Sequence, residues 1–268
     1  MTNFKLTLEY DGSKFYGWQY QPKLRTVQGE LERALEILLR EKVHVNVAGR
    51  TDAGVHALGQ VSNFKTNVEV DLQNILRSLN GILPHDVVVK HVEPVPVEFH
   101  ARYDALSRQY CYVISRYPVA VGRGYAFFNK FPLDLEVMQQ ASRHLLGEHN
   151  FRAFCSSATD DPHYLSYVEA LEWEDRGEKI VMRIRANRFL RSMVRIIVGS
   201  LLQVGRGKMA SEEIAKILAA QNRIAAGVTA PPHGLFLEKV FYAPDHIAPR
   251  RKARFEEPVL MEEETYLE

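Results

Sequence analysis

The chain has 268 residues, of which 46% are hydrophobic and 25% are charged, and its formal net charge is +1. Such a composition is ordinary for one large globular domain or two smaller ones, and the near-zero charge means that any binding of a polyanion must depend on local clusters. Two cysteines make neither a disulfide framework nor a zinc site. The first residues alternate polar and apolar, and no apolar run nears the ~18 residues of a membrane helix, so we expect no signal peptide, no membrane partner and a cytoplasmic protein.

The first hundred residues predict an α+β unit. Alternating apolar residues predict a strand over 4–10, and further strands are expected over 43–47, 60–65 and 87–92. Helical spacing predicts one helix over 27–40, capped by Thr26, and another from Asp71 to Asn80-Gly81. This order is that of a ferredoxin-like (split βαβ) unit, an antiparallel sheet backed by two helices, which we place at residues 1–104.

An aromatic loop, FYGWQYQP, follows the first predicted strand. Aromatic side chains in a loop can close the edge of a core, and they can also stack on unpaired bases. The sequence leaves both alternatives open for Tyr16 and for Trp18.

Residues 105–245 repeat the same order loosely. Strands are expected over 107–115, 167–173, 180–186 and 235–242, with a hairpin turn at Asp175-Arg176-Gly177. Helices are expected from Asp134 to a stop at Gly147, along an apolar stripe over 190–202, and from a cap at Ser211 to residue 218. We therefore expect two ferredoxin-like halves that form a mostly antiparallel sheet, with an active-site cleft between them and a charged tail over 246–268.

The stretch AGRTDAGVHALGQ, residues 48–60, combines a carboxylate, a guanidinium, an imidazole and a terminal amide with three glycines. It is too poor in bulky apolar residues for a core segment, and glycines permit tight turns and close approach of another backbone. We therefore expect a loop that presents its polar groups. The alternative is an Asx turn at Asp52 with Arg50 as its solvated partner.

Basic residues cluster in the second half. Residues 179–211 hold eight lysines and arginines and no acid. Arg188, Arg191 and Arg195 lie three and four positions apart, which predicts that they share one helix face. Guanidinium groups clamp phosphates and stack on bases, so we interpret the cluster as a nucleic-acid contact, the alternative being a solvated helix face. The expected RNA-contact patch is Arg183, Arg185, Arg188 and Arg191.

Six stretches, in order over residues 4–242, resemble the tRNA pseudouridine synthase A family: YDGSKFYGWQYQP, AGRTDAGVHALGQ, RQYCYVI, LLGEHNFRAF, NRFLRSMVRIIVGSLLQVG and HGLFLEKVFY. The resemblance implies isomerisation of uridine to pseudouridine at positions 38, 39 and 40 of the tRNA anticodon stem-loop. It also implies a homodimer as the working form. No redox step occurs and no phosphate leaves, so we expect no metal and no cofactor.

By this resemblance Asp52 is the catalytic nucleophile, and Arg195 is the arginine that pairs with it across the two halves. A nearby cation favours the ionised carboxylate that a nucleophile needs. A carboxylate can attack the anomeric carbon of the ribose, add to the pyrimidine ring, or assist deprotonation of the ribose. The sequence leaves these three routes open.

The resemblance also assigns the substrate contacts. Tyr110 packs on the target base, and its phenol is a candidate general base for a later proton transfer. Arg50 occupies the space left by the flipped nucleotide. We expect Gln60 and His56 to shape the loop or to touch RNA.

Two other functions fit parts of the sequence. A non-catalytic RNA-binding module would also need the basic cluster but not Asp52. A glycoside hydrolase normally uses two carboxylates, and the nearest acid upstream of Asp52 is Glu41.

Overall fold

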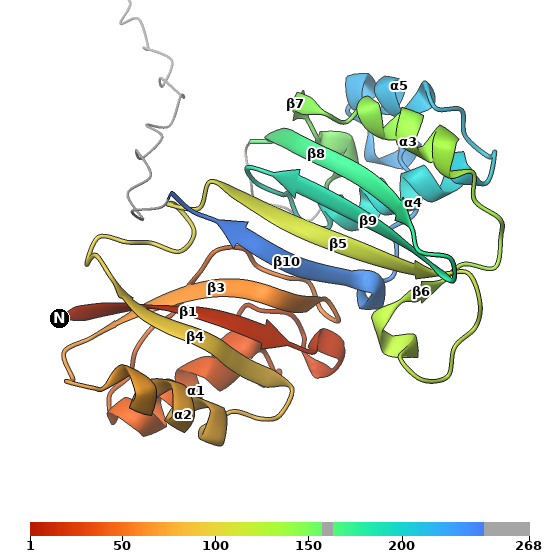
Figure 1. Ribbon diagram of the computed structural model, residues 1–268. Coiled ribbons are helices and arrows are strands. Elements are labelled where there is room, and N and C mark those ends of the chain that lie inside the picture. Colours follow the sequence, from red (N-terminus) through yellow and green to blue (C-terminus); the bar gives the residue numbers. More distant parts are fainter. Residues whose placement is uncertain (157–162, 244–268) are drawn as a thin grey trace, which may run out of the picture.

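The computed structural model describes residues 1–156 and 163–243, and ten strands of this part join into one mostly antiparallel sheet (Figure 1). The strand order is β4-β1-β3-β10-β5-β9-β8-β7, with β2 paired to β3 and β6 paired to β5. The strands are β1 (Thr2–Tyr10), β2 (Asn46–Val47), β3 (His56–Thr66), β4 (Val87–Val95), β5 (Ser107–Ser115), β6 (Phe127–Phe128), β7 (Gly147–Asn150), β8 (Leu165–Asp175), β9 (Lys179–Ala186) and β10 (Leu235–Phe241).

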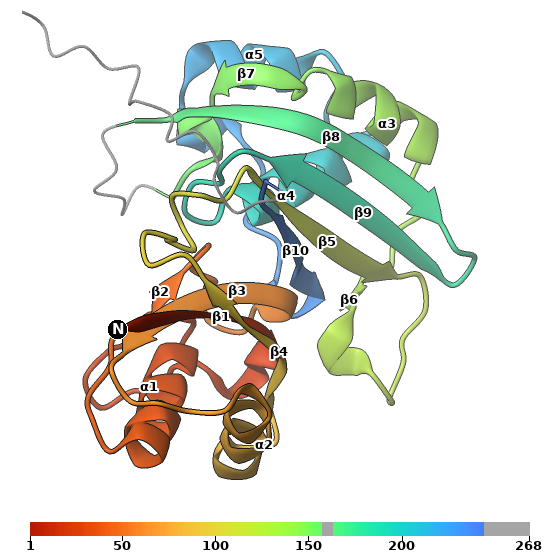
Figure 2. The same ribbon diagram turned by 60° about the vertical axis from the view of Figure 1, so that its left-hand side comes forward.

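Helices back the sheet in two groups. They are α1 (Val27–Leu39), α2 (Leu72–Ile82), α3 (Leu135–Arg143), α4 (Met193–Gly205) and α5 (Glu213–Ala220). Helices α1 and α2 lie by β1, β3 and β4, and the other three lie by β5, β8 and β9 (Figures 1 and 2). No helix within residues 1–156 and 163–243 is long and apolar enough to cross a membrane.

Local sequence accounts for several elements as predicted. The side chain of Thr26 accepts a hydrogen bond from the amide of Gly29 (3.2 Å) and starts α1. The apolar face of that helix, with Val27 and Leu31 fully buried, packs into the core. Asp71 caps α2 in the same way, through the amide of Asn74 (3.0 Å). Strand β5 and the hairpin of β8 and β9 also follow the predicted pattern.

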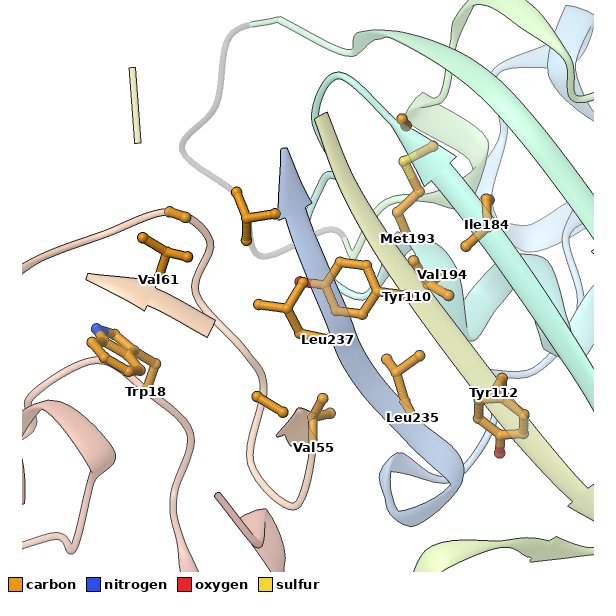
Figure 3. Packing of buried hydrophobic residues seen from close by; sticks show 14 of the residues in the cluster. Trp18, Val55, Val61, Tyr110, Tyr112, Ile184, Met193, Val194, Leu235 and Leu237 are labelled. Atoms are coloured by element: carbon orange, nitrogen blue, oxygen red, sulfur yellow. The ribbon is translucent and has the colours of Figure 1, made fainter. Parts of the chain in front are cut away.

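The two groups of elements meet at a short parallel pairing between β3 and β10. Only Phe236 with His56 and Leu237 with Ala57 are in register there, whereas β10 pairs along most of its length with β5. Buried side chains continue across this junction, with Val55 on one side and Leu237 and Tyr110 on the other (Figure 3). The junction therefore brings the glycine-rich loop, which precedes β3, beside the second half.

Two predicted boundaries near this junction are wrong. Strand β3 begins at His56 rather than Gln60, because the end of the glycine-rich stretch pairs with β10. Helix α4 begins only at Met193, since Ser192 has a left-handed backbone (φ 60°) and the amide of Met193 bonds the Leu190 carbonyl in a turn. Two of the arginines expected on one helix face, at positions 188 and 191, therefore precede the helix.

Other boundaries shift by one turn or less. Helix α2 continues through Gly81 and ends at an extended Leu83. Helix α3 ends at Arg143, and Gly147 (φ 91°) instead opens β7, which no pattern predicted. The Ser211 hydroxyl bonds the carboxylate of the next residue and does not cap α5. The expected strand over 43–47 is reduced to β2, and the tail over 246–268 lies outside the described residues.

A buried arginine at the start of β5 ties several loops together. Arg108 donates to the Ala48 carbonyl from Nε (3.1 Å) and Nη2 (2.8 Å), and to the Asn187 carbonyl from Nη1 (2.8 Å). It also donates to the carbonyls of Arg102 and Ala105. Burial lowers the pKa of its guanidinium, but arginine stays charged near neutral pH. Backbone carbonyls thus solvate one cation and join the loop before β3 to the segment before α4.

We predict that Arg108→Met lowers the free energy of unfolding by roughly 2–4 kcal/mol, because buried carbonyls lose their donors. Chemical denaturation measures this. The control is Arg77→Met on the exposed side of α2, for which we expect a change within about 0.5 kcal/mol. Equal changes in the two variants would show that Arg108 holds nothing in place.

Candidate functional site

The loop that carries Asp52 is held in place by contacts with β1 and with the aromatic loop that follows it. The Thr51 carbonyl accepts a hydrogen bond from the amide of Trp18 (3.1 Å), and the Thr51 hydroxyl shares one with the Tyr10 hydroxyl (2.8 Å). Gly17 (φ 90°) passes so close that a Cβ there would lie 2.7 Å from the Thr51 carbonyl oxygen. A glycine is therefore required, and the backbone before Asp52 is held on both sides.

Asp52 and Arg195, the two groups expected to pair, lie in contact. Arg195 Nη1 is 3.0 Å from Asp52 Oδ2, and Arg195 Nε donates to the Ala230 carbonyl (2.8 Å). The side chains are 28% and 17% exposed, so solvent and a ligand can still reach the pair. Asp52 Oδ1 accepts no hydrogen bond from the described residues. The geometry thus leaves one carboxylate oxygen available while the other holds the guanidinium.

Ser192 is part of this arrangement, and no pattern in the sequence predicted its role. Its hydroxyl donates to Asp52 Oδ2 at 2.9 Å, beside the Arg195 contact. A serine before an apolar helical stripe usually caps the helix through its side chain, yet Ser192 makes no such cap. Its left-handed backbone is rare for a residue with a side chain. Residues kept in this conformation cluster at functional sites.

Tyr110 lies on β5, above the junction. Its side chain is buried, its ring packs edge-on against Phe189 (centroids 5.1 Å apart), and Figure 3 shows it among Leu237, Met193 and Val194. Its hydroxyl finds no hydrogen-bond partner in the described part of the chain. Burial, with a smaller contribution from the negative charge of Asp52, raises the pKa of this phenol. The phenol therefore stays protonated near neutral pH, which favours packing over general-base chemistry.

The two aromatic residues for which the sequence left core packing and base stacking open, Tyr16 and Trp18, lie in different environments. Trp18 is 1% exposed and belongs to the core, whereas Tyr16 is 57% exposed. Tyr16 helps to line an open depression of about 410 Å³ with Ser13, Lys14, Phe15, Ala53 and Gly54. Arg50 is also exposed, and no described residue bonds or pairs with its side chain. Tyr16 and Arg50 are therefore accessible, and Arg50 lies two residues before Asp52 along the chain.

His56 and Gln60 are enclosed by protein. Gly12 donates to His56 Nδ1 (3.0 Å), so the ring proton lies on Nε2, which bonds the Gly124 carbonyl (3.1 Å). Gln60 is fully buried and donates to the Gly49 carbonyl (2.7 Å). Of the two roles expected for these residues, the contacts favour shaping the loop over touching RNA.

The expected arginine patch is not the acid-free surface that the linear sequence indicated. Carboxylates from other strands of the sheet reach two of its members. Arg183 pairs with Glu174 of β8 (2.8 Å) and Glu238 of β10 (3.2 Å), and Arg185 pairs with Glu169 of β8 (2.5 Å). The backbone of Arg188 and Arg191 instead belongs to the segment before α4, and the Arg191 carbonyl accepts from the amide of Ser156 (3.0 Å). Only this second pair adjoins Ser192 and the Asp52 site.

The described residues contain no group of three or more histidine, cysteine, aspartate or glutamate side chains placed to hold a metal ion.

The chain is similar over most of its length to proteins of one family. The family model described as tRNA pseudouridine synthase matches residues 7–104 and 141–243. A tRNA pseudouridine synthase A of Bacillus licheniformis is 44% identical over 242 residues, covering 89% of this chain and 98% of the relative. The Bacillus subtilis protein of that name is 41% identical over 242 residues, with the same coverage. A solved H/ACA RNP bound to a substrate RNA aligns with 75% of this chain and 53% of its own at 10% identity, but its TM-score of 0.32 is too low for an argument.

We predict that His56 makes the folded state sensitive to acid. Burial lowers the pKa of His56 below its usual 6.5, and the Asp11 carboxylate opposes this only in part. The unfolded chain therefore takes up a proton first, and stability falls as the pH drops below about 6.5, by at most about 1.4 kcal/mol per pH unit. Urea denaturation between pH 7.5 and 5 should show a shallower decline for His56→Gln than for wild type. The exposed control His85→Gln should keep the wild-type slope, and a His56→Gln slope equal to it would contradict the prediction.

Proposed function

Because this chain belongs to the tRNA pseudouridine synthase family of isomerases, we propose that it converts uridine to pseudouridine at positions 38, 39 and 40 of the tRNA anticodon stem-loop. The observation that carries the proposal is the 3.0 Å contact between Asp52 and Arg195, at the junction of the two halves. We place the reaction in the cytoplasm.

In this proposal Asp52 is the nucleophile and Oδ1 is its reacting oxygen. Arg195 and Ser192 both donate to Oδ2, which fixes the plane of the carboxylate and leaves Oδ1 exposed. The reaction breaks the bond between C1′ and N1, turns the base and joins C1′ to C5. C5 loses its proton, and N1 gains one. Attack at C1′, addition to the ring and assistance to ribose deprotonation all use an ionised carboxylate.

The target uridine must leave its stack before Asp52 can reach it, at a cost of a few kcal/mol. We propose that Tyr110 packs on the extruded base and that Arg50 fills the space left in the RNA. The exposure of Arg50 and the enclosure of Tyr110 at the junction support these roles. Arg188 and Arg191 contact RNA near the site, and His56 and Gln60 keep the loop in shape.

We also propose that residues 1–104 and 105–245 are two ferredoxin-like halves. The strand order supports this: β4-β1-β3 with β2 on β3 in the first, and β10-β5-β9-β8 in the second. We also propose that two copies of the chain form a homodimer that shares one tRNA.

The alternative of a two-carboxylate glycoside hydrolase finds no support. Glu41 accepts a hydrogen bond from the hydroxyl of Thr66, at the end of β3 opposite to the Asp52 loop. The remaining alternative, a non-catalytic RNA-binding module, is distinguished by the next experiment.

We predict that Asp52→Asn binds tRNA within about threefold of wild type but forms pseudouridine at least about a thousandfold more slowly, because the amide cannot act as a nucleophile. Release of tritium from C5-labelled tRNA under single-turnover conditions measures the rate. The matched control is Asp71→Asn at the start of α2, where asparagine also caps a helix. A rate above about a hundredth of wild type in Asp52→Asn would remove Asp52 from this role.

We predict that Arg195→Gln lowers the single-turnover rate by roughly a hundredfold to a thousandfold, because the carboxylate loses a charged donor, with tRNA affinity within about threefold. Ser192→Gly removes one neutral donor while tolerating the left-handed backbone, so its rate should fall by about tenfold. If Arg195→Gln weakened binding and left the rate at saturating tRNA unchanged, Arg195 would be a phosphate clamp instead.

A further inference from the structure

A second group of cations lies at the other end of α4, around the ring of Phe131. Arg206 Cζ lies 4.7 Å from the ring centroid, Lys130 Nζ lies 5.1 Å from it and Lys208 Nζ lies 6.0 Å from it. The ring itself is 43% exposed. We call these four residues the Phe131 cluster. Lys130 and Phe131 follow β6 closely in the chain, and Figure 1 shows β6 at the end of β5 that lies away from the N-terminal half.

No carboxylate in the described ranges forms an ion pair with any of the three cations of the Phe131 cluster. This distinguishes them from Arg183 and Arg185, which acids from neighbouring strands neutralise. The nearest acid along the chain, Asp134, accepts from the amide of Val137 (3.1 Å) and starts α3. Three like charges thus converge on one ring without a partner of opposite sign.

A purely structural explanation is that these cations offset the negative end of the dipole of α4, which ends at Gly205. A helix C-terminus carries the equivalent of only about half a negative charge. Contacts with an exposed aromatic ring add about 0.5–1 kcal/mol each. Neither effect balances three positive charges, so the cluster retains a strong local field for an anion.

Asn129 holds two members of the cluster, Phe131 and Arg206, in position. Asn129 is buried, and its backbone amide donates to the Ser115 carbonyl (3.0 Å). Its side-chain amide donates to the Phe131 carbonyl (2.5 Å). Its side-chain oxygen accepts a hydrogen bond from Arg206 Nη2. Arg206 Nε is buried and has no acceptor in the described structure, and burial lowers the pKa of this guanidinium. An incoming anion would supply the negative charge that this guanidinium lacks as a partner.

From these observations we propose that the Phe131 cluster binds phosphate groups of the tRNA backbone outside the target nucleotide. The proposal rests on the proposed function, which supplies tRNA as the polyanion. Arg195 lies in the first turn of α4 and Arg206 directly follows its last residue, so the two are eleven residues and about 16 Å apart along the helix axis. That separation is too great for the cluster to touch a nucleotide held at Asp52, so it grips a flanking part of the RNA and contributes affinity rather than chemistry.

The test is the salt dependence of tRNA binding by the full-length protein. The variant Lys130→Gln/Lys208→Gln removes two charges from the cluster and leaves Arg206, whose Nε is buried, in place. The matched control, Lys42→Gln/Lys216→Gln, removes two exposed lysines from other parts of the surface. Dissociation constants for one unmodified tRNA transcript are measured from 50 to 300 mM KCl, and the single-turnover rate is measured at saturating tRNA.

We expect the cluster variant to raise Kd by roughly 5- to 20-fold at 100 mM salt and to reduce the slope of log Kd against log salt by about 1.4–1.8, as for two lost phosphate contacts. Its saturated rate should stay within twofold of wild type. A Kd and slope equal to those of the control variant would overturn the proposal. Absence of pseudouridine formation in wild type would instead overturn the proposed function, so the two failures are distinguishable.

Discussion

The contact between Asp52 and Arg195 is the interaction on which the site depends, because its two groups come from different halves of the chain. A carboxylate on a loop of the first half meets a guanidinium on the first turn of α4. The contact forms only if the sheet continues from β3 into β10, and only two residue pairs are in register there. Arg108 reinforces the junction by bonding carbonyls from both sides.

Much of the architecture could be predicted because local patterns determine it. The alternation in β1 and the caps at Thr26 and Asp71 act within a few residues, and the elements formed where expected. Boundaries set by tertiary contacts could not be found in this way. Strand β3 gains residues because β10 pairs with it, and α4 loses its predicted first turn because Ser192 turns toward Asp52.

The site shows the same division. The glycine-rich motif indicated Asp52 and Arg50, and the resemblance to a family predicted that Arg195 pairs with Asp52, which the structure confirms. The part played by Ser192 was missed because a serine before a helix resembles an ordinary cap. The basic stretch was interpreted too simply, since a gap in acids along the chain is not a gap in space. Glutamates from β8 and β10 lie beside Arg183, whereas the cations around Phe131 come from two distant segments and no linear pattern joined them.

The position of β10 in the sheet has a consequence for how the enzyme is made. This strand is the final one in chain order among the described residues, yet it lies between β3 and β5 and has neighbours on both sides. A nascent chain emerging from the ribosome can assemble β1, β3 and β4 early, but the middle of its sheet stays open until residues 235–241 are synthesised. Residues 235–241 must therefore be synthesised before the aspartate and its arginine are brought together, so translation products that stop before β10 hold an unassembled site.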